Sequence, residues 1–413
     1  MEQVIFGGVK NPLDDFFTEY NTLFGGATWD STEGLEGFIV STPGKIKNLR
    51  VKLDGAPGAG TSYTFTLMVN GVPSLLTCII QNLETSKADM VNEIAVVAGN
   101  KVDLQCVPAG TPTVRNAIWT TMFEGTNAKE SIIGGSTYNT SLSNAADRYL
   151  QIMTANSGVT IPENDLRQVC PTSGKLKNFY VETRISPGIA PDAYRFTLRI
   201  NGVNTAVVAT VTAPATTGNS GANEVVVAAG NILTILVEPV DTPANSPEAV
   251  WGMTFEADID GESIAMAGSW RDLDTALTEY NHLQTDFADT WTNVEADRYN
   301  LGQVTTLKKL HIKLSAFPGA GLSYTFNVRV AGGAGNLTVI VTGAATDTGS
   351  DLISTDVIAN DNYLGLQCVP AGPPAVADAY WGVVGYIAPP APPTGLENKS
   401  ANMGSKMVGA GFI

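Results

Sequence analysis

One pattern occurs three times in this chain of 413 residues, and this internal repeat constrains the fold more than any other feature. The pattern is a Pro-Gly pair followed by alternating aromatic or aliphatic and polar residues. Its copies span residues 57–71, 187–202 and 318–332. The segment Leu-Gln-Cys-Val-Pro-Ala-Gly also recurs, at 104–110 and 366–372. The copies begin about 130 residues apart, at 57, 187 and 318. A repeat of about 130 residues encodes one structural unit per copy, so the sequence predicts three similar domains in tandem.

The alternation within each copy predicts β-strands. In the first copy, Tyr63, Phe65, Leu67 and Val69 alternate with two threonines and a methionine, which is the two-residue period of a strand with one buried face. Asn-Gly pairs follow in the first and second copies, at 70–71 and 201–202, and predict tight hairpin turns. Three equivalent tryptophans are expected in the cores: Trp119, Trp251 and Trp381.

Each repeat has room for about eight short strands, which is the number in a jelly roll. We therefore predict an all-β protein of three tandem β-sandwich, jelly-roll-like domains, arranged about a pseudo-threefold axis. The expected domains are residues 1–126, 127–258 and 259–388. Only Asp14–Thr22 and Asp272–Leu283 have a helix-like pattern. Short linkers predict that neighbouring domains touch.

Residues 389–413 form the fourth predicted segment, a proline-rich linker and an extended C-terminal tail. The segment begins with a proline-rich stretch typical of a stiff polyproline spacer. The remainder has too little apolar surface to fold alone, and we expect it to dock on a partner. The candidate docking residues are Lys406, Met407, Phe412 and Ile413.

Composition excludes several classes of partner and cofactor. The net charge of −16 leaves no basic surface for nucleic acid or for anionic membranes. No apolar run is long enough to span a membrane, and the first residues lack the features of a secretory signal. With two histidines and four cysteines in the chain, we expect no metal site and no cofactor.

The histidines and cysteines do not form a recognisable catalytic arrangement. Cys106 and Cys368 occupy one repeat position that is Val237 in the second copy, which indicates a buried, small apolar site. We expect buried free thiols for all four cysteines, Cys78 and Cys170 included. His282 and His311 do not recur between repeats and are expected to be exposed or partly exposed. The prediction is that the chain is not an enzyme.

Trp29 and Trp291 match each other in polar surroundings and are the candidate platform for a glycan. Packing between neighbouring domains explains the two tryptophans equally well, so both interpretations stay open at this point.

The string Pro-Gly-Ala-Gly-x-Ser-Tyr-Thr-Phe at 57–65 and 318–326 resembles a module of structural proteins in tailed bacteriophages and prophages. The resemblance covers the later two-thirds of each repeat, and the second copy departs most. It implies a jelly-roll-like sandwich in a virion protein that is made in the host cytoplasm. The expected function is capsid decoration or a surface appendage, with other virion proteins and copies of itself as partners.

The alternative is a carbohydrate-binding or adhesin array that recognises a host-surface glycan. A major capsid protein and a polysaccharide-degrading enzyme are lower-ranked alternatives, the enzyme last, because it would need two facing carboxyl groups in a cleft.

Overall fold

The computed structural model describes residues 1–8, 11–25, 28–154, 162–285 and 289–389. These residues form antiparallel strands and three short 3-10 turns, so the all-β prediction is confirmed. The strands make six sheets of four or five strands each. Every strand ladder closes within residues 2–125, 130–257 or 262–386, which we name the first, second and third unit.

The first unit pairs a sheet of order β1-β9-β4-β7 with a sheet of order β2-β8-β5-β6, to which β3 adds at β8. Its elements are β1 (Glu2–Gly8), β2 (Glu19–Asn21), η1 (Glu33–Leu35), β3 (Phe38–Ile39), β4 (Gly44–Leu53), β5 (Gly58–Val69), β6 (Val72–Asn82), β7 (Ser86–Val96), β8 (Lys101–Ala109) and β9 (Ala117–Gly125).

The second unit keeps this arrangement, except that two short strands, β16 and β17, together take the place of β7 beside the long strand β13. Its elements are β10 (Glu130–Ser136), β11 (Arg148–Leu150), η2 (Glu163–Leu166), β12 (Gln168–Val169), β13 (Gly174–Thr183), β14 (Ala193–Ile200), β15 (Val203–Thr212), β16 (Thr217–Asn219), β17 (Glu224–Val227), β18 (Ile232–Val240) and β19 (Ala249–Ala257).

The third unit has the same sheet orders as the first, β20-β28-β23-β26 and β21-β27-β24-β25, with β22 added at β27. Its elements are β20 (Glu262–Ser269), β21 (Glu279–Asn281), η3 (Glu295–Asp297), β22 (Asn300–Leu301), β23 (Thr305–Leu314), β24 (Gly319–Val330), β25 (Gly333–Gly343), β26 (Thr348–Ile358), β27 (Tyr363–Ala371) and β28 (Ala379–Tyr386).

The repeated aromatic residues form the core of each unit, as their alternation predicts. Tyr63, Phe65 and Leu67 on β5 are fully buried, and so are their counterparts on β14 and β24. The three repeated tryptophans, on β9, β19 and β28, are also fully buried. Asn70 and Gly71 both have positive φ angles, which matches the predicted hairpin turn between β5 and β6.

The two predicted helical stretches are wrong, because aspartate side chains organise turns there. The carboxylate of Asp14 accepts hydrogen bonds from the backbone N–H groups of Phe16 and Phe17, and β2 follows. Asp274 does the same in the third unit, with Ala276 and Leu277. An aspartate that binds the backbone N–H groups two and three residues ahead favours a local turn over a helix.

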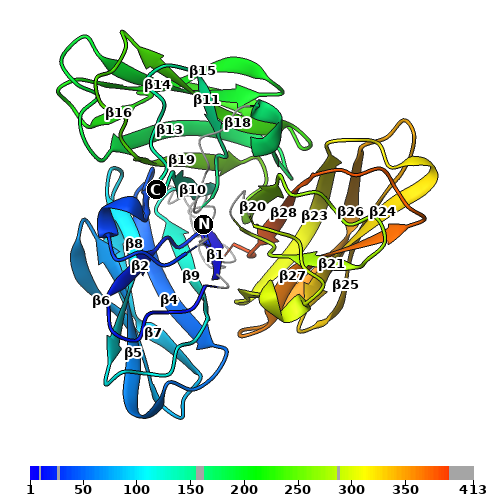
Figure 1. Ribbon diagram of the computed structural model, residues 1–413, viewed down its shortest axis with the longest axis horizontal. Helices are drawn as coiled ribbons and strands as arrows, with labels where there is room; N and C mark the ends of the chain where they lie inside the picture. Colours follow the sequence, from blue (N-terminus) through cyan, green and yellow to red (C-terminus); the bar gives the residue numbers. More distant parts are fainter. Residues whose placement is uncertain (9–10, 26–27, 155–161, 286–288, 390–413) are drawn as a thin grey trace, which may run out of the picture.

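The three units lie around a common centre, and β1, β10 and β20 lie nearest to it (Figure 1). The apolar core continues across the boundaries between units. One buried cluster joins the first and second units, and another joins the third unit to Val4, Phe6 and Met122 of the first. The predicted contact between neighbouring units is therefore confirmed.

Candidate functional site

The units are joined by one contact that is used three times in rotation. The short strand β3 of the first unit packs on β10 and β19 of the second. In the same way β12 of the second unit packs on β20 and β28 of the third, and β22 of the third unit packs on β1 and β9 of the first. Because each unit both gives a strand and receives one, the contacts close into a ring.

Glycine residues make room for the incoming strands. A Cβ atom built on Gly252 would lie 1.6 Å from the carbonyl oxygen of Ile39, and one on Gly382 would lie 2.1 Å from the carbonyl oxygen of Val169. Gly8 and Gly268 face backbone oxygens of the preceding unit at 2.9 Å and 2.6 Å in the same sense. Only glycine lets two backbones approach so closely.

Buried glutamates at the start of the central strands bind across two of the junctions. Glu262 accepts a hydrogen bond from Thr172 of the second unit at 2.6 Å, and it pairs with Lys308 and Lys309 at 2.9 and 2.7 Å. Burial opposes its charge, but these hydrogen bonds outweigh burial and lower the pKa of Glu262. Glu130 likewise accepts a hydrogen bond from Thr42 of the first unit.

The junction between the third and first units is held by contacts between residues far apart in the chain. Arg50 on β4 pairs with Asp361 at 3.1 Å, and the Gln303 amide donates to the carbonyl of Asn48 at 3.3 Å. The Gln284 side chain donates to the carbonyl of Phe24 at 3.2 Å. Since no direct chain connection imposes this junction, these contacts and the packing of β22 on β1 and β9 must hold the ring closed.

Each junction contains a cleft at the equivalent place, but the three clefts differ greatly in size. The cleft between the first and second units holds about 10 Å³, and that between the second and third units about 240 Å³. The cleft between the third and first units reaches about 430 Å³. That volume falls within the range of small-molecule sites, which often lie between domains. We refer to it as the first–third cleft.

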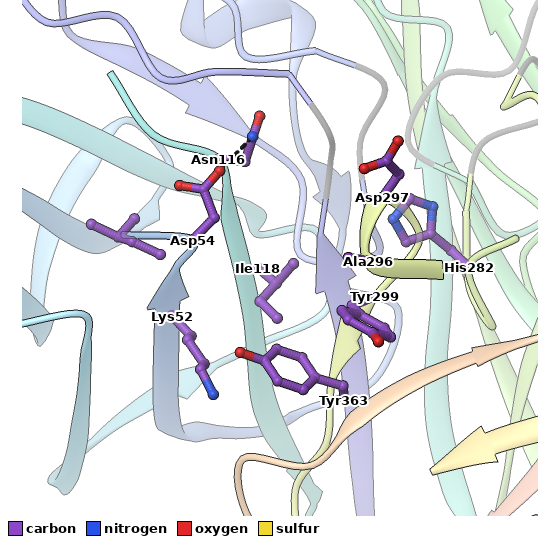
Figure 2. A pocket seen from close by; sticks show the side chains of 10 residues that line it. Lys52, Asp54, Asn116, Ile118, His282, Ala296, Asp297, Tyr299 and Tyr363 are labelled. Carbon is purple, nitrogen blue, oxygen red and sulfur yellow. Dashed lines mark hydrogen bonds between the residues drawn. The ribbon is translucent and has the colours of Figure 1, made fainter. Parts of the chain in front are cut away.

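Side chains from two units face each other across the first–third cleft (Figure 2). On the third unit, the half-buried rings of Tyr299 and Tyr363 stack with centroids 4.5 Å apart. On the first unit, the Lys52 ammonium lies 4.1 Å from the centre of the Tyr363 ring, and Asn116 donates to the Asp54 carboxylate at 2.7 Å. The lining is completed by Leu53, Ile118, His282, Ala296 and Asp297.

The tyrosine pair is a departure from the repeat. The strand pairings place Tyr363 at the position of Lys101 in the first unit and Ile232 in the second. Tyr299 is two residues before Leu301 of β22, where the other units have Gly37 and Arg167. The packing of the sandwich therefore does not require two aromatic rings at this place.

Both histidines are buried, so the prediction that they are exposed is wrong. His282 is 3% exposed, and its Nδ1 lies 2.6 Å from the Asp289 carboxylate, which also pairs with Arg298. His311 is 9% exposed, and burial followed by the charge of Lys309 lowers its pKa. His311 is on β23, which also contacts β12 of the second unit.

Trp29 and Trp291 do not form an exposed glycan platform. They are 6% and 7% exposed, and each ring packs on a core tryptophan, at 5.2 Å from Trp119 and 5.5 Å from Trp381. The loops that carry them fold back across the end of their own sandwich and bridge to β2 and β21. The aromatic contacts of both rings are with residues of their own unit, which include Phe65 for Trp29 and Phe326 for Trp291.

The cysteines and the tail residues complete the set of predicted site residues. All four cysteines are buried and free, as expected, and burial raises the pKa of Cys78 and of Cys170 to about 12. Four predicted docking residues lie outside the described residues: Lys406, Met407, Phe412 and Ile413.

Within the described residues, no group of three or more His, Cys, Asp or Glu side chains could hold a metal ion. The same part of the chain contains no helix that could cross a membrane.

The first unit has buried acids at a place where its sister units have an arginine paired with a glutamate. In the second and third units, Arg199 and Arg329 pair with the glutamates of η2 and η3, both at 2.8 Å. Met68 occupies this position in the first unit, opposite Asp103 on β8.

Both carboxylate oxygens of Asp103 are buried without a hydrogen-bond partner, and Glu36 is also buried. Burial, reinforced by the charge of Glu33, raises the pKa of Asp103 to about 8. Burial also raises the pKa of Glu36, together with the charges of Asp30 and Asp103, while Lys101 opposes the shift for both groups.

Comparison with known proteins gives no family for this chain. No protein-family model matches the sequence, and no curated protein matches it significantly.

Proposed function

We propose that the chain is a structural protein of a phage particle, a capsid decoration or surface-appendage protein whose partners are other virion proteins and copies of itself. One observation carries the proposal: three similar antiparallel sandwiches close into a ring through the same strand contact. This is the arrangement that three separate copies would take in a homotrimer. A body of this kind offers a broad, rigid surface for attachment.

The sheet orders support the jelly-roll part of the proposal. The strands of the first and third units can be counted from one to nine within each unit. One sheet then has the order 1-9-4-7, and the facing sheet has the order 2-8-5-6. Two sheets of four strands linked in this way are characteristic of the double Greek key of a jelly roll. The net charge of −16 supports protein partners over nucleic acid.

Purified particles provide the test of this function. If the chain is a virion protein, density-gradient-purified particles contain it at a constant ratio to the major shell protein, as mass spectrometry measures. If the chain stays in the soluble fraction of the lysate as a free protein, the proposal is wrong.

A truncation after Ile387 tests whether the tail tethers the body to the particle. We expect the shortened protein to keep its melting temperature, because the described strands end at Tyr386. Its occupancy on particles should fall more than about tenfold, because the tether no longer holds the body near its partner. Full occupancy of the truncated protein would show that the sandwich body alone makes the attachment.

One observation favours the second function, a carbohydrate-binding or adhesin protein. The first–third cleft has the volume of a ligand site and presents two half-buried tyrosines beside polar side chains. A surface appendage that also binds a host glycan would combine both functions.

A further inference from the structure

The side chains of the first–third cleft match the chemistry of a sugar. A pyranose ring carries hydroxyl groups on its edge and C–H groups on its faces, so a sugar site needs apolar rings beside both donors and acceptors. Tyr299, Tyr363 and Ile118 supply the apolar surface. Lys52 is a donor, Asp54 is an acceptor, and the two are only two residues apart on one edge of the cleft.

The polar groups are already held in place. The Asp54 carboxylate accepts from the Asn116 side chain at 2.7 Å, and the Asp54 backbone N–H donates to the Asn116 carbonyl at 3.1 Å. Tyr299 and Tyr363 fix each other by stacking. The Lys52 side chain is flexible, so a ligand can displace the ammonium from the Tyr363 ring. The displaced ammonium can then donate a hydrogen bond to the ligand. Such preorganisation reduces the entropy lost on binding.

The charges of the lining select a neutral ligand. Two carboxylates, Asp54 and Asp297, line the cleft with one ammonium, Lys52. His282 also lines the cleft, and its Nδ1 lies 2.6 Å from the Asp289 carboxylate, so the His282–Asp289 pair contributes no net positive charge. A phosphorylated or carboxylated ligand would meet an excess of negative charge there and on the protein as a whole.

We propose that the first–third cleft is a binding site for a neutral saccharide, formed only where the third unit closes on the first. The repeat supports a dedicated site, because the other two junctions have Lys101 and Ile232 in place of Tyr363. This inference rests on the second proposed function and does not depend on attachment to a particle.

The full chain can be tested on a printed array of neutral and acidic oligosaccharides, followed by calorimetric titration with the neutral sugar that gives the strongest signal. Two variants borrow residues from sister units: Tyr363→Ile introduces the residue at position 232, and Asp54→Ser introduces the residue at position 315. We expect each to weaken binding at least about tenfold, which corresponds to about 1.4 kcal/mol. Thermal melting should be unchanged for Asp54→Ser, whose side chain is exposed.

The matched control is Arg167→Ala. Arg167 is the residue of the second unit that is equivalent to Tyr299, and it lines the cleft between the second and third units. This variant should bind the sugar as the unchanged chain does. Three results would overturn the proposal: no neutral sugar bound, a preference for acidic sugars, or equal binding by the Asp54→Ser variant. Particle occupancy is measured separately from sugar binding. Absence of sugar binding therefore does not contradict the structural role, and absence from particles does not contradict the saccharide site.

Discussion

Replacing Asp103 with asparagine is expected to stabilise the protein, by an amount that grows as the pH rises from about 4 to about 8. The folded state raises the pKa of this carboxyl from 3.8 to about 8, because Asp103 is buried without a hydrogen-bond partner and near Glu33. Below the unfolded pKa both states hold the proton, and the carboxyl costs no stability. Between the two pKa values only the folded state holds the proton, so the stability of the unchanged protein falls.

The expected slope is at most about 1.4 kcal/mol per pH unit, and relaxation around the carboxyl should limit the total gain at about pH 8 to a few kcal/mol. Chemical unfolding at a series of pH values measures this gain in the free energy of unfolding.

Met68→Arg should also stabilise the protein near pH 8, because it restores the cation that Arg199 and Arg329 supply in the sister units. The control is Thr234→Asn, at the position of Asp103 in the second unit.

Thr234→Asn should leave the pH dependence unchanged, because it adds no carboxyl group and keeps a side-chain donor beside Glu163, which Thr234 hydrogen-bonds at 2.7 Å. A gain for Asp103→Asn that is the same at pH 4 and pH 8 would contradict the account of Asp103. A loss of stability at both values would do so as well.

Gly252→Ala is expected to destabilise the protein more than the same substitution at Gly8, Gly268 or Gly382, the glycines of the other junctions. The new Cβ would lie 1.6 Å from the carbonyl oxygen of Ile39, which is backbone and cannot rotate away. The junction of the first and second units must therefore open or shift, at a cost of at least about 3 kcal/mol. Thermal unfolding should show a strongly lowered midpoint or a separate early transition for the first unit.

Gly333→Ala is the matched control for this change. Gly333 begins β25 at the outer edge of its sheet, and the nearest atom to an added Cβ is 3.5 Å away, an ordinary contact. Its melting temperature should stay close to that of the unchanged protein. Equal melting temperatures for both variants would mean that β3 does not pack against Gly252.

The sequence predicts the strands well because their pattern is local. The alternation through Tyr63 and Phe65 identifies a strand with one buried face, and the structure buries both residues. The buried free cysteines follow from the same logic, since Val237 occupies the place of Cys106. Local patterns fail where a side chain acts on the backbone, as at Asp14, whose carboxylate organises a turn in a predicted helix.

The burial of Trp29 and the location of the cleft depend on how distant segments meet, which the sequence around each residue does not reveal. The polar neighbours of Trp29 left both an exposed platform and packing between domains open, whereas its loop folds over the end of its own sandwich. The cleft joins Lys52 to Tyr299 and Tyr363 through a junction between the first and last units. The sequence does carry one signal of the cleft: at the positions of Tyr299 and Tyr363 the repeats have unrelated residues.

The closed ring is the central claim, and the junction of the third unit with the first tests it most directly. A short bismaleimide can join cysteines introduced at Arg50 and Asp361, whose side chains pair at 3.1 Å across this junction. The four natural cysteines are buried and should not react. Lys45 is exposed on the same strand, five residues or about 16 Å from Arg50, and gives the control pair with Asp361.

For the closed ring, mass spectrometry of the folded monomer should find the intramolecular link between positions 50 and 361 and no link between positions 45 and 361. A folded monomer in which positions 50 and 361 do not link, or link no more than the control pair, would contradict the ring.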